Sequence, residues 1–196
     1  GTMHHQSEPK DGVEWTPQDP SIAQIRQALV EYAILPNGSA EVKMGIDDAK
    51  QVKSICLYGP SGSGKTLAVE AVASELGALL IHLTPEKLKG HFSGKGGPTR
   101  LVHMAFTVAR DPTMQPCVIY IDECDQFFYG AKKAKADKEG PSRFKKDLMT
   151  YKNQALGPEH RVIVIGSTRT PENGEAKDLK NFFDKFLYMP FPDYSS

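Results

Sequence analysis

Gly59-Pro60-Ser61-Gly62-Ser63-Gly64-Lys65-Thr66 is the stretch on which the fold of this chain depends. It has the form G-x-x-x-x-G-K-[ST], in which glycines allow a tight loop whose backbone N–H groups turn inward toward phosphate oxygens. The N-terminus of a following helix favours the same anions, the lysine reaches the β- and γ-phosphates, and the threonine hydroxyl is a ligand for Mg²⁺. We therefore expect this loop, and Leu67 directly after it, to bind the phosphates of a nucleotide.

The segments on either side of this loop have the order that the motif requires. Residues 52–58 form a short, mostly apolar run that predicts a buried strand, and residues 66–76 predict a helix that Gly77 closes. A glycine-rich turn without a ligand is the simpler interpretation, but it leaves Gly-Lys-Thr at this strand-to-helix junction unexplained. The context therefore favours a phosphate site.

A second landmark is the apolar run 116–121, which ends in Asp122 and Glu123. Such a run is typical of a central parallel strand whose C-terminal tip reaches an active site. We expect Asp122 to hold Mg²⁺ alongside Thr66, mostly through water. Glu123 is placed to orient or deprotonate an attacking water. Strands also end in acids at ordinary turns, but the upstream phosphate loop favours the functional interpretation.

Length and composition fit one α/β domain. The chain has 196 residues, of which 39% are hydrophobic, and 24 Lys and Arg balance 24 Asp and Glu, so no global field favours nucleic acid or an acidic membrane. No apolar run approaches the length of a membrane span. Cys56, Cys117 and Cys124 lack C-x-x-C spacing, which indicates reduced, buried thiols in a cytosolic protein and argues against a zinc site.

The remaining elements follow from periodicity and turn chemistry. We expect a mobile arm over residues 1–18, whose first residues look like an artificial end, and a helix from Asp19-Pro20-Ser21 to about Leu35, stopped by the turn 36–38. Thr84 is the expected cap of a further helix. Further strands are expected over 78–83, 161–168 and 182–190, and helices over 99–110 and 142–156.

Two segments have the composition of exposed loops. Residues 90–98 are rich in glycine and carry Phe92, and residues 131–146 are rich in lysine. The lysine-rich segment is either solvated or in contact with an acidic partner. Because no aromatic residues are interleaved with the lysines, the sequence gives little support to a nucleic-acid groove.

In order and content these landmarks resemble the AAA+ ATPase family over residues 20–194. Residues 118–123 are similar to its Walker B strand, 162–171 to its first-sensor segment and 183–193 to its closing strand. The resemblance implies a three-layer α/β sandwich with a central, mostly parallel sheet. It also implies that residues 19–196 are a nucleotide-binding core, cut before the family's helical lid, that binds ATP or ADP with Mg²⁺ and hydrolyses ATP.

Three positions depart from the family pattern. Arg169 occupies the first-sensor tip in place of Asn, and we expect it to sense the γ-phosphate in cis as a catalytic residue. Phe182 replaces the arginine that in the family reaches the γ-phosphate bound by the neighbouring subunit. At the second position where the family has a basic residue, this chain has Lys185, whose ammonium lacks the planar, two-pronged geometry of an arginine side chain. Since such an arginine contributes about a thousandfold or more to hydrolysis, activation across a homo-oligomer is not supported. Phe92 matches the aromatic pore loop, whereas Ser93 and Lys95 depart from it.

A narrower resemblance is to the IQ-and-AAA-domain proteins, carried by residues 31–36, 94–97, 166–171 and 190–194. These proteins are associated with the nexin–dynein regulatory complex of cilia and flagella. The resemblance implies an axonemal setting, protein partners that are other assembly subunits or copies of the chain, and calmodulin binding by an IQ region outside this chain.

Two alternatives to an ATPase remain. A structural module that holds nucleotide without hydrolysis is favoured by Phe182 and opposed by the intact Asp122-Glu123 pair. A P-loop kinase would need an acceptor pocket and a lid, with Arg100 or Arg110 in the arginine role.

Overall fold

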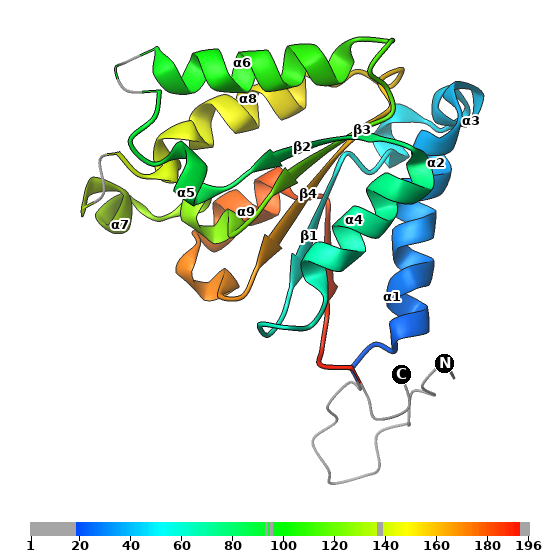
Figure 1. The fold of residues 1–196 in the computed structure, drawn as a ribbon, viewed down its shortest axis with the longest axis horizontal. Helices are drawn as coiled ribbons and strands as arrows, with labels where there is room; N and C mark the ends of the chain where they lie inside the picture. Colours follow the sequence, from blue (N-terminus) through cyan, green and yellow to red (C-terminus); the bar gives the residue numbers. More distant parts are fainter. Residues whose placement is uncertain (1–18, 93, 95, 137–138, 193–196) are drawn as a thin grey trace, which may run out of the picture.

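The computed structural model describes residues 19–92, 94, 96–136 and 139–192, so the predicted arm and the departures at Ser93 and Lys95 lie outside the described residues. Within them, five parallel strands form one sheet in the order β2-β3-β4-β1-β5 (Figure 1). The strands are β1 (Ser54–Tyr58), β2 (Leu79–Leu83), β3 (Cys117–Ile121), β4 (Val162–Thr168) and β5 (Lys185–Tyr188).

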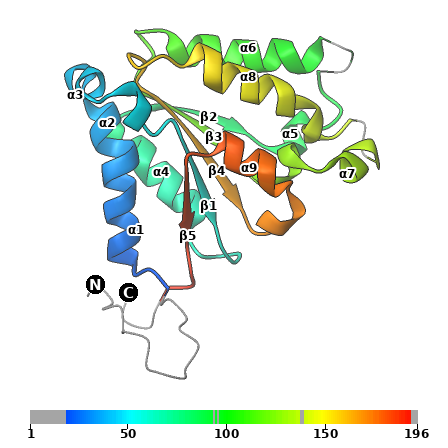
Figure 2. The same cartoon turned by 180° about the vertical axis from the view of Figure 1, so that it is seen from behind.

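Helices cover both faces of this sheet (Figures 1 and 2). One face packs against α1 (Ile22–Leu29) and α4 (Lys65–Leu76), and the other against α6 (Gly97–Arg110), α8 (Lys145–Ala155) and α9 (Ala176–Phe182). Side chains alternate along β3, so Val118 and Tyr120 join the first cluster while Ile119 and Ile121 join the second. Both faces of the central strands are therefore buried, and the predicted three-layer sandwich is confirmed.

The phosphate loop and α4 form where the motif places them. Gly77 ends α4 in the left-handed conformation at φ 59°, as predicted. Gly59 opens the loop at φ 152°, and a Cβ atom there would lie 2.1 Å from the carbonyl oxygen of Met189, just after β5. Only glycine allows β1 to turn into the loop this close to the end of β5.

The N-terminal helix runs further than predicted. Ser21 caps α1 with a capping box, as the start signal predicts, but the helical path continues through a π turn, Val30–Ile34, into α2 (Leu35–Gly38). The predicted stop before residues 36–38 is therefore wrong. The helix continues because of a residue that is far away in sequence. The Arg161 guanidinium donates to the carbonyls of Asn37 (2.8 Å) and Gly38 (2.9 Å), which satisfies the helix end.

Several shorter elements complete the chain. The lysine-rich segment forms α7 over residues 131–136, so the predicted loop is wrong there, and the predicted strand 182–190 is correct only for β5, because Phe182 ends α9. Thr84 precedes α5, but its side chain makes no cap. These short elements are α3 (Ala40–Gly45), α5 (Pro85–Leu88), α7 (Ala131–Ala136) and the 3₁₀ turns η2 (Asp48–Lys50), η3 (Cys124–Phe128), η4 (Pro141–Phe144) and η5 (Pro171–Asn173).

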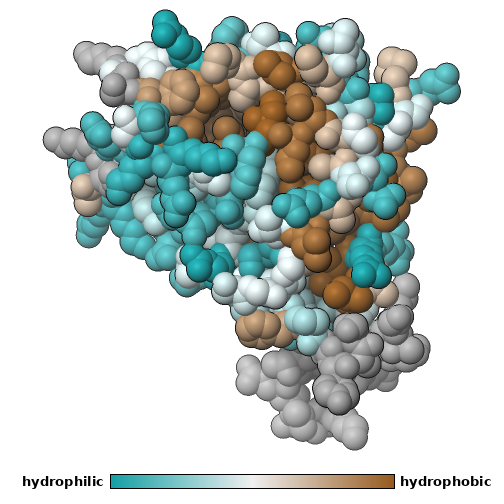
Figure 3. All heavy atoms as spheres, viewed as in Figure 1, coloured by the Kyte–Doolittle hydropathy of each residue, from teal (hydrophilic) through white to brown (hydrophobic). Residues whose placement is uncertain are grey.

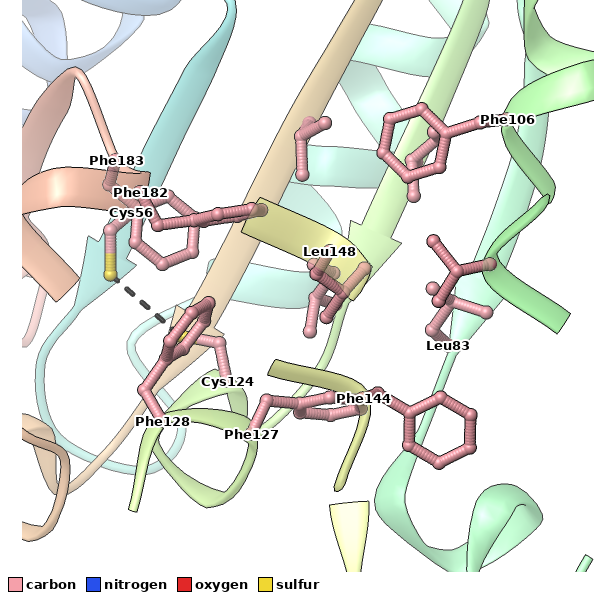
Figure 4. Packing of buried hydrophobic residues seen from close by; sticks show 14 of the residues in the cluster. Cys56, Leu83, Phe106, Cys124, Phe127, Phe128, Phe144, Leu148, Phe182 and Phe183 are labelled. Atoms are coloured by element: carbon pink, nitrogen blue, oxygen red, sulfur yellow. Dashed lines mark hydrogen bonds between the residues drawn. The ribbon is translucent and has the colours of Figure 1, made fainter. Parts of the chain in front are cut away.

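Phenylalanines fill the core between the sheet, η3 and α9 (Figure 4). The ring of Phe182 lies 4.9 Å from that of Phe128 and 4.8 Å from that of Phe183, measured between centroids. Cys56 and Cys124 are buried here with their sulfurs 3.8 Å apart, and Cys117 is buried as well. All three cysteines are free, as predicted, and burial raises the pKa of Cys117 to about 12 and that of Cys124 well above its usual value.

One face of the molecule carries an exposed apolar area. Figure 3 shows it where the edge strand β2 runs between α6 and α4. Leu79 on β2 and Met104 and Val108 on α6 are exposed large apolar side chains of these elements. No helix of the described part of the chain has the length and apolar character needed to cross a membrane.

Candidate functional site

The predicted site residues meet at one edge of the sheet. Because β1, β3 and β4 are parallel neighbours, their C-terminal tips and the loops that follow them lie together (Figure 1). They surround a pocket of about 480 Å³. Its lining residues are Ser61, Gly62, Gly64, Lys65, Thr66, Leu67, Asp122, Glu123, Ser167, Thr168 and Arg169.

Lys65 lies folded against its own loop. Its Nζ donates to the carbonyl oxygens of Gly59 (2.9 Å) and Pro60 (2.6 Å) and to the hydroxyl of Ser63 (3.2 Å). Burial lowers the pKa of Lys65, and the nearby charge of Arg169 lowers it further, while Asp122 acts in the opposite direction. The loop therefore holds a cationic side chain at the pocket wall, where a phosphate anion could exchange with these carbonyls.

A chain of hydroxyl groups connects the loop to Asp122. The Tyr120 hydroxyl lies 3.2 Å from Thr66 Oγ1, 2.8 Å from Ser167 Oγ and 3.1 Å from Asp122 Oδ1. Oδ1 also accepts from the Ser167 hydroxyl (2.7 Å) and the Glu123 backbone N–H (2.9 Å). Burial raises the pKa of Tyr120, so its phenol stays neutral. Thr66 and Asp122, the two predicted metal ligands, are thus joined through one shared neighbour.

Glu123 lies in a different environment one residue later. Its backbone is in the left-handed region at φ 45°, which is strained for a residue with a side chain. Arg169 Nη2 contacts Glu123 Oε1 at 2.5 Å, and Gln126 Nε2 donates to Oε2 at 2.5 Å. Both carboxylate oxygens of Glu123 therefore already have partners, and Arg169 points to Glu123.

The donor atoms of the pocket fit a magnesium ion that binds together with a nucleotide. Among the described residues no group of three or more His, Cys, Asp or Glu could hold a metal by itself. Thr66 and Asp122 supply a hydroxyl and a carboxylate, which are hard oxygen donors of the kind that Mg²⁺ prefers when phosphates and waters complete its shell.

Comparison with known proteins identifies the family. Residues 55–191 match the model of the ATPase family associated with various cellular activities (AAA). The chain belongs to this AAA family. Membership confirms the resemblance derived from the phosphate loop and the Asp122-Glu123 strand, and it argues against the kinase alternative.

Individual relatives agree with the narrower resemblance. The chain is 37% identical over 178 residues to Dynein regulatory complex protein 11 of Mus musculus, a match that covers 90% of this chain and 20% of that protein. It is 32% identical over 172 residues to Spastin of Ixodes scapularis, covering 87% and 25%. The crystal structure of the FIGL-1 AAA domain in complex with ADP matches with a TM-score of 0.71 at 28% identity, over 90% of this chain and 55% of that one. This AAA domain thus spans a fifth to a quarter of the two relatives matched by sequence.

Other predicted residues lie away from the pocket of this AAA domain. Phe182, at the arginine position of the family, is 1% exposed and packs in the core (Figure 4). Lys185 lies over the ring of Tyr32, 5.1 Å from its centroid. Phe92 is on a separate loop, where its carbonyl accepts a hydrogen bond from Arg143 at 3.0 Å. None of these residues lines the pocket.

Sequence reasoning missed Tyr120, Gln126 and Asp125, and it gave no role to Ser167, which it expected beside the tip of the Asp122 strand. Tyr120 and Ser167 could have been found, because residues two apart on a strand share a face and Ser167 follows the register partner of Ile121. Asp125 is buried and accepts from the Thr168 hydroxyl at 2.7 Å, which ties η3 to β4, and burial raises the pKa of its carboxyl. No sequence pattern indicates Gln126, since its hydrogen bond to Glu123 depends on the conformation of the η3 turn.

Proposed function

We propose that this AAA domain binds ATP with Mg²⁺ and hydrolyses it, at a low rate until Glu123 is released from Arg169. The observation that carries the proposal is the gathering of Lys65, Thr66, Asp122 and Glu123 around one pocket. The nucleotide-binding core comprises residues 19–196 in this proposal, with residues 1–18 as a separate arm.

The binding roles follow from the chemistry of each group. The loop from Gly59 to Leu67 surrounds the phosphates with backbone N–H groups, and Lys65 moves its ammonium from the loop carbonyls to phosphate oxygens. Thr66 and Asp122 hold Mg²⁺, which when bound neutralises charge on the phosphate oxygens. The matched FIGL-1 AAA domain forms a complex with ADP, which supports nucleotide binding by this domain.

The hydrolytic role belongs to Glu123. Its carboxylate accepts a proton from the attacking water, for which a lone pair of one oxygen must face that water. We propose that Arg169 leaves Glu123 Oε1 for the γ-phosphate, so that ATP itself makes the base available. The pair is exposed, with 56% of the Arg169 side chain and 33% of the Glu123 side chain accessible, and such pairs contribute only about 0–1 kcal/mol. A phosphate anion therefore competes easily.

A second candidate function is a module that holds nucleotide with little or no hydrolysis. The Arg169–Glu123 pair favours it, because an ion pair with arginine makes the carboxylate a weaker base, and Gln126 holds its other oxygen. So does Phe182, because a buried phenylalanine cannot serve a neighbouring subunit as an arginine would. This candidate shares the nucleotide site with the first and differs from it only in turnover.

The biological setting is proposed from the relatives. Similarity to Dynein regulatory complex protein 11 supports a role within a dynein regulatory assembly of the axoneme, with protein partners from that assembly or further copies of the chain. The exposed apolar side chains beside β2 are consistent with such partners. Calmodulin binding through a segment outside this chain is part of the same proposal.

ATP turnover by the full-length protein tests the function. We expect measurable turnover in the wild type, turnover about 10²–10⁴-fold lower in Glu123→Gln with ATP binding retained, and loss of ATP binding in Lys65→Ala. Equal turnover by wild type and Glu123→Gln would rule out the hydrolytic role. ATP binding without turnover in the wild type would establish the second candidate.

A further inference from the structure

Tyr120 is a polar exception inside an apolar strand. It lies near the end of β3, its side chain is 1% exposed, and β3 is otherwise built from Cys, Val and Ile. Its ring stacks on His82 of β2, with centroids 4.6 Å apart. Because residues two apart share a face, the ring lies on the side of Asp122 and brings its hydroxyl to the pocket edge. A phenylalanine would fill the same space, so packing alone does not require the hydroxyl.

The two oxygens of the Asp122 carboxylate have different surroundings. Oδ1 has three donors within reach: the Glu123 N–H (2.9 Å), the Ser167 hydroxyl (2.7 Å) and the Tyr120 hydroxyl (3.1 Å). No hydrogen bond from the described residues reaches Oδ2. The carboxylate is therefore held through one oxygen while the other remains available for a cation.

Counting hydrogens shows what Tyr120 does for Thr66. Tyr120, Ser167 and Asp122 Oδ1 form a triangle in which two hydroxyl hydrogens serve three contacts. Ser167 and Tyr120 both donate to the carboxylate oxygen. With its single hydrogen directed to Asp122, the Tyr120 oxygen keeps a lone pair for the Thr66 hydroxyl, 3.2 Å away.

We propose that Tyr120 is a positioning residue that links the two magnesium ligands of the site. It accepts the Thr66 hydroxyl hydrogen and helps fix Asp122 Oδ1, which leaves the Thr66 oxygen lone pairs and Asp122 Oδ2 for the metal. A hydroxyl that coordinates a cation becomes a stronger donor and needs such an acceptor. The inference rests on the proposed binding of ATP with Mg²⁺ and adds to it a residue outside the expected ligand set.

The test measures metal dependence of binding, without turnover. A fluorescent, non-hydrolysable ATP analogue is bound to the full-length protein in EDTA and then across a Mg²⁺ titration. We expect Tyr120→Phe to raise the half-saturating Mg²⁺ concentration about tenfold, at the low end of the 10–100-fold effects of residues that orient metal ligands. Affinity in EDTA should stay unchanged, because the phosphate loop is intact. Mn²⁺ binding followed by electron paramagnetic resonance should show the same weakening.

Tyr151→Phe is the matched control, because the Tyr151 hydroxyl bonds His103 between α8 and α6, away from the pocket. It should leave the Mg²⁺ titration unchanged. Ser167→Ala should shift the titration less than Tyr120→Phe, since it leaves the Thr66 contact in place. Far-ultraviolet circular dichroism and thermal unfolding of each variant show whether it is folded.

The outcomes separate this inference from the proposed function. A wild type whose analogue affinity responds to Mg²⁺, together with an identical response in Tyr120→Phe, overturns the role of Tyr120 and leaves the proposed function standing. A wild type that binds the analogue equally with and without Mg²⁺ overturns both the metal part of the function and the Tyr120 role. A larger shift in Ser167→Ala than in Tyr120→Phe would move the linking role to Ser167.

Discussion

Asp122 and Glu123 are adjacent in sequence, but they belong to two differently built halves of the site. Asp122 belongs to a binding half, which we define as Lys65, Thr66, Tyr120, Asp122 and Ser167. Glu123 belongs to a hydrolytic half, defined as Glu123, Gln126 and Arg169. The binding half lies on the strand tips and α4, and three of its hydroxyl groups contact one another or Asp122. The hydrolytic half lies on turns, with a left-handed backbone at Glu123 and an exposed ion pair.

The difference suggests how the two activities are controlled. Removing one partner from a buried hydrogen-bonded group costs about 1–3 kcal/mol, so the binding half keeps its arrangement before nucleotide arrives. An exposed ion pair contributes at most about 1 kcal/mol, so the hydrolytic half rearranges at little cost. Nucleotide binding is therefore built into the fold, whereas hydrolysis depends on contacts that a ligand or partner can change.

The largest expected effect comes from breaking the hydrolytic half alone. Glu123→Gln removes the base and keeps the shape, so turnover should fall about 10²–10⁴-fold, the usual contribution of a positioned acid or base. Analogue affinity should change little, because the binding half is intact. Phosphate release and analogue binding by the full-length protein measure the two quantities.

Asp122→Asn provides the contrast, since it makes the same chemical change one residue earlier. It should weaken the Mg²⁺-dependent part of binding, which Glu123→Gln leaves alone. If both variants lost Mg²⁺-dependent binding equally, the division into two halves would be wrong.

Arg169→Ala changes turnover in two opposite ways, and the larger of the two free-energy terms decides whether turnover rises or falls. Freeing Glu123 from the exposed pair gains at most about 1 kcal/mol. Losing a charged hydrogen bond to the γ-phosphate costs about 1.5–3 kcal/mol, which is larger. Turnover should therefore fall, by about twofold to about 150-fold, because the two terms combine to a net loss of about 0.5–3 kcal/mol.

Steady-state phosphate release measures this effect, with Lys185→Ala as the control because Lys185 lies outside the pocket. Faster turnover in Arg169→Ala would show that Arg169 only restrains the base and makes no contact with phosphate.

The two halves should also differ in their contribution to folding. Tyr120→Phe removes a buried hydroxyl with several partners and should lower the free energy of unfolding by about 1 kcal/mol without ligand. Arg169→Ala should change it by no more than about 0.5 kcal/mol, as is usual for exposed side chains. Urea unfolding curves of the full-length protein compare them. A larger loss in Arg169→Ala would mean that the hydrolytic half is part of the stable core.

The amino-acid sequence alone was enough to predict the parallel sheet and three of the five residues of the binding half. Buried parallel strands are continuous apolar runs, and the motif fixes a strand, a loop and a helix in order. Residue types and their spacing therefore sufficed to bring Lys65, Thr66 and Asp122 together at one pocket. Arg169, which was expected to sense the γ-phosphate, also lines the pocket, because it follows β4 and β4 neighbours β3.

What the sequence could not predict depends on distant partners or local turns. The N-terminal helix passes Leu35 because Arg161 reaches its end, and no local pattern shows that contact. The helix α9 is short and polar, with Leu179 and Phe182 as its buried residues, so its aromatic end resembled a strand. The pairing of Arg169 with Glu123 depends on the conformation of two turns, which residue types alone do not determine.

The smallest expected effect concerns a charge that acts between the two halves. The Arg169 guanidinium is in the hydrolytic half, yet after burial it is the next largest cause that lowers the pKa of Lys65 below 10.5. Phosphate binding favours protonated Lys65, so analogue affinity should fall as the pH rises through the Lys65 pKa of the nucleotide-free protein. Because that pKa is lowered, the loss of affinity should begin at a lower pH than for an exposed lysine.

Arg169→Ala removes one of the charges that lower the Lys65 pKa. The loss of affinity should therefore move to higher pH, whatever the substitution does to affinity at neutral pH. Analogue titrations from neutral to alkaline pH, with Lys185→Ala as the unchanged control, measure this midpoint. An Arg169→Ala curve that falls at the wild-type pH or below would show that the charge of Arg169 does not reach Lys65.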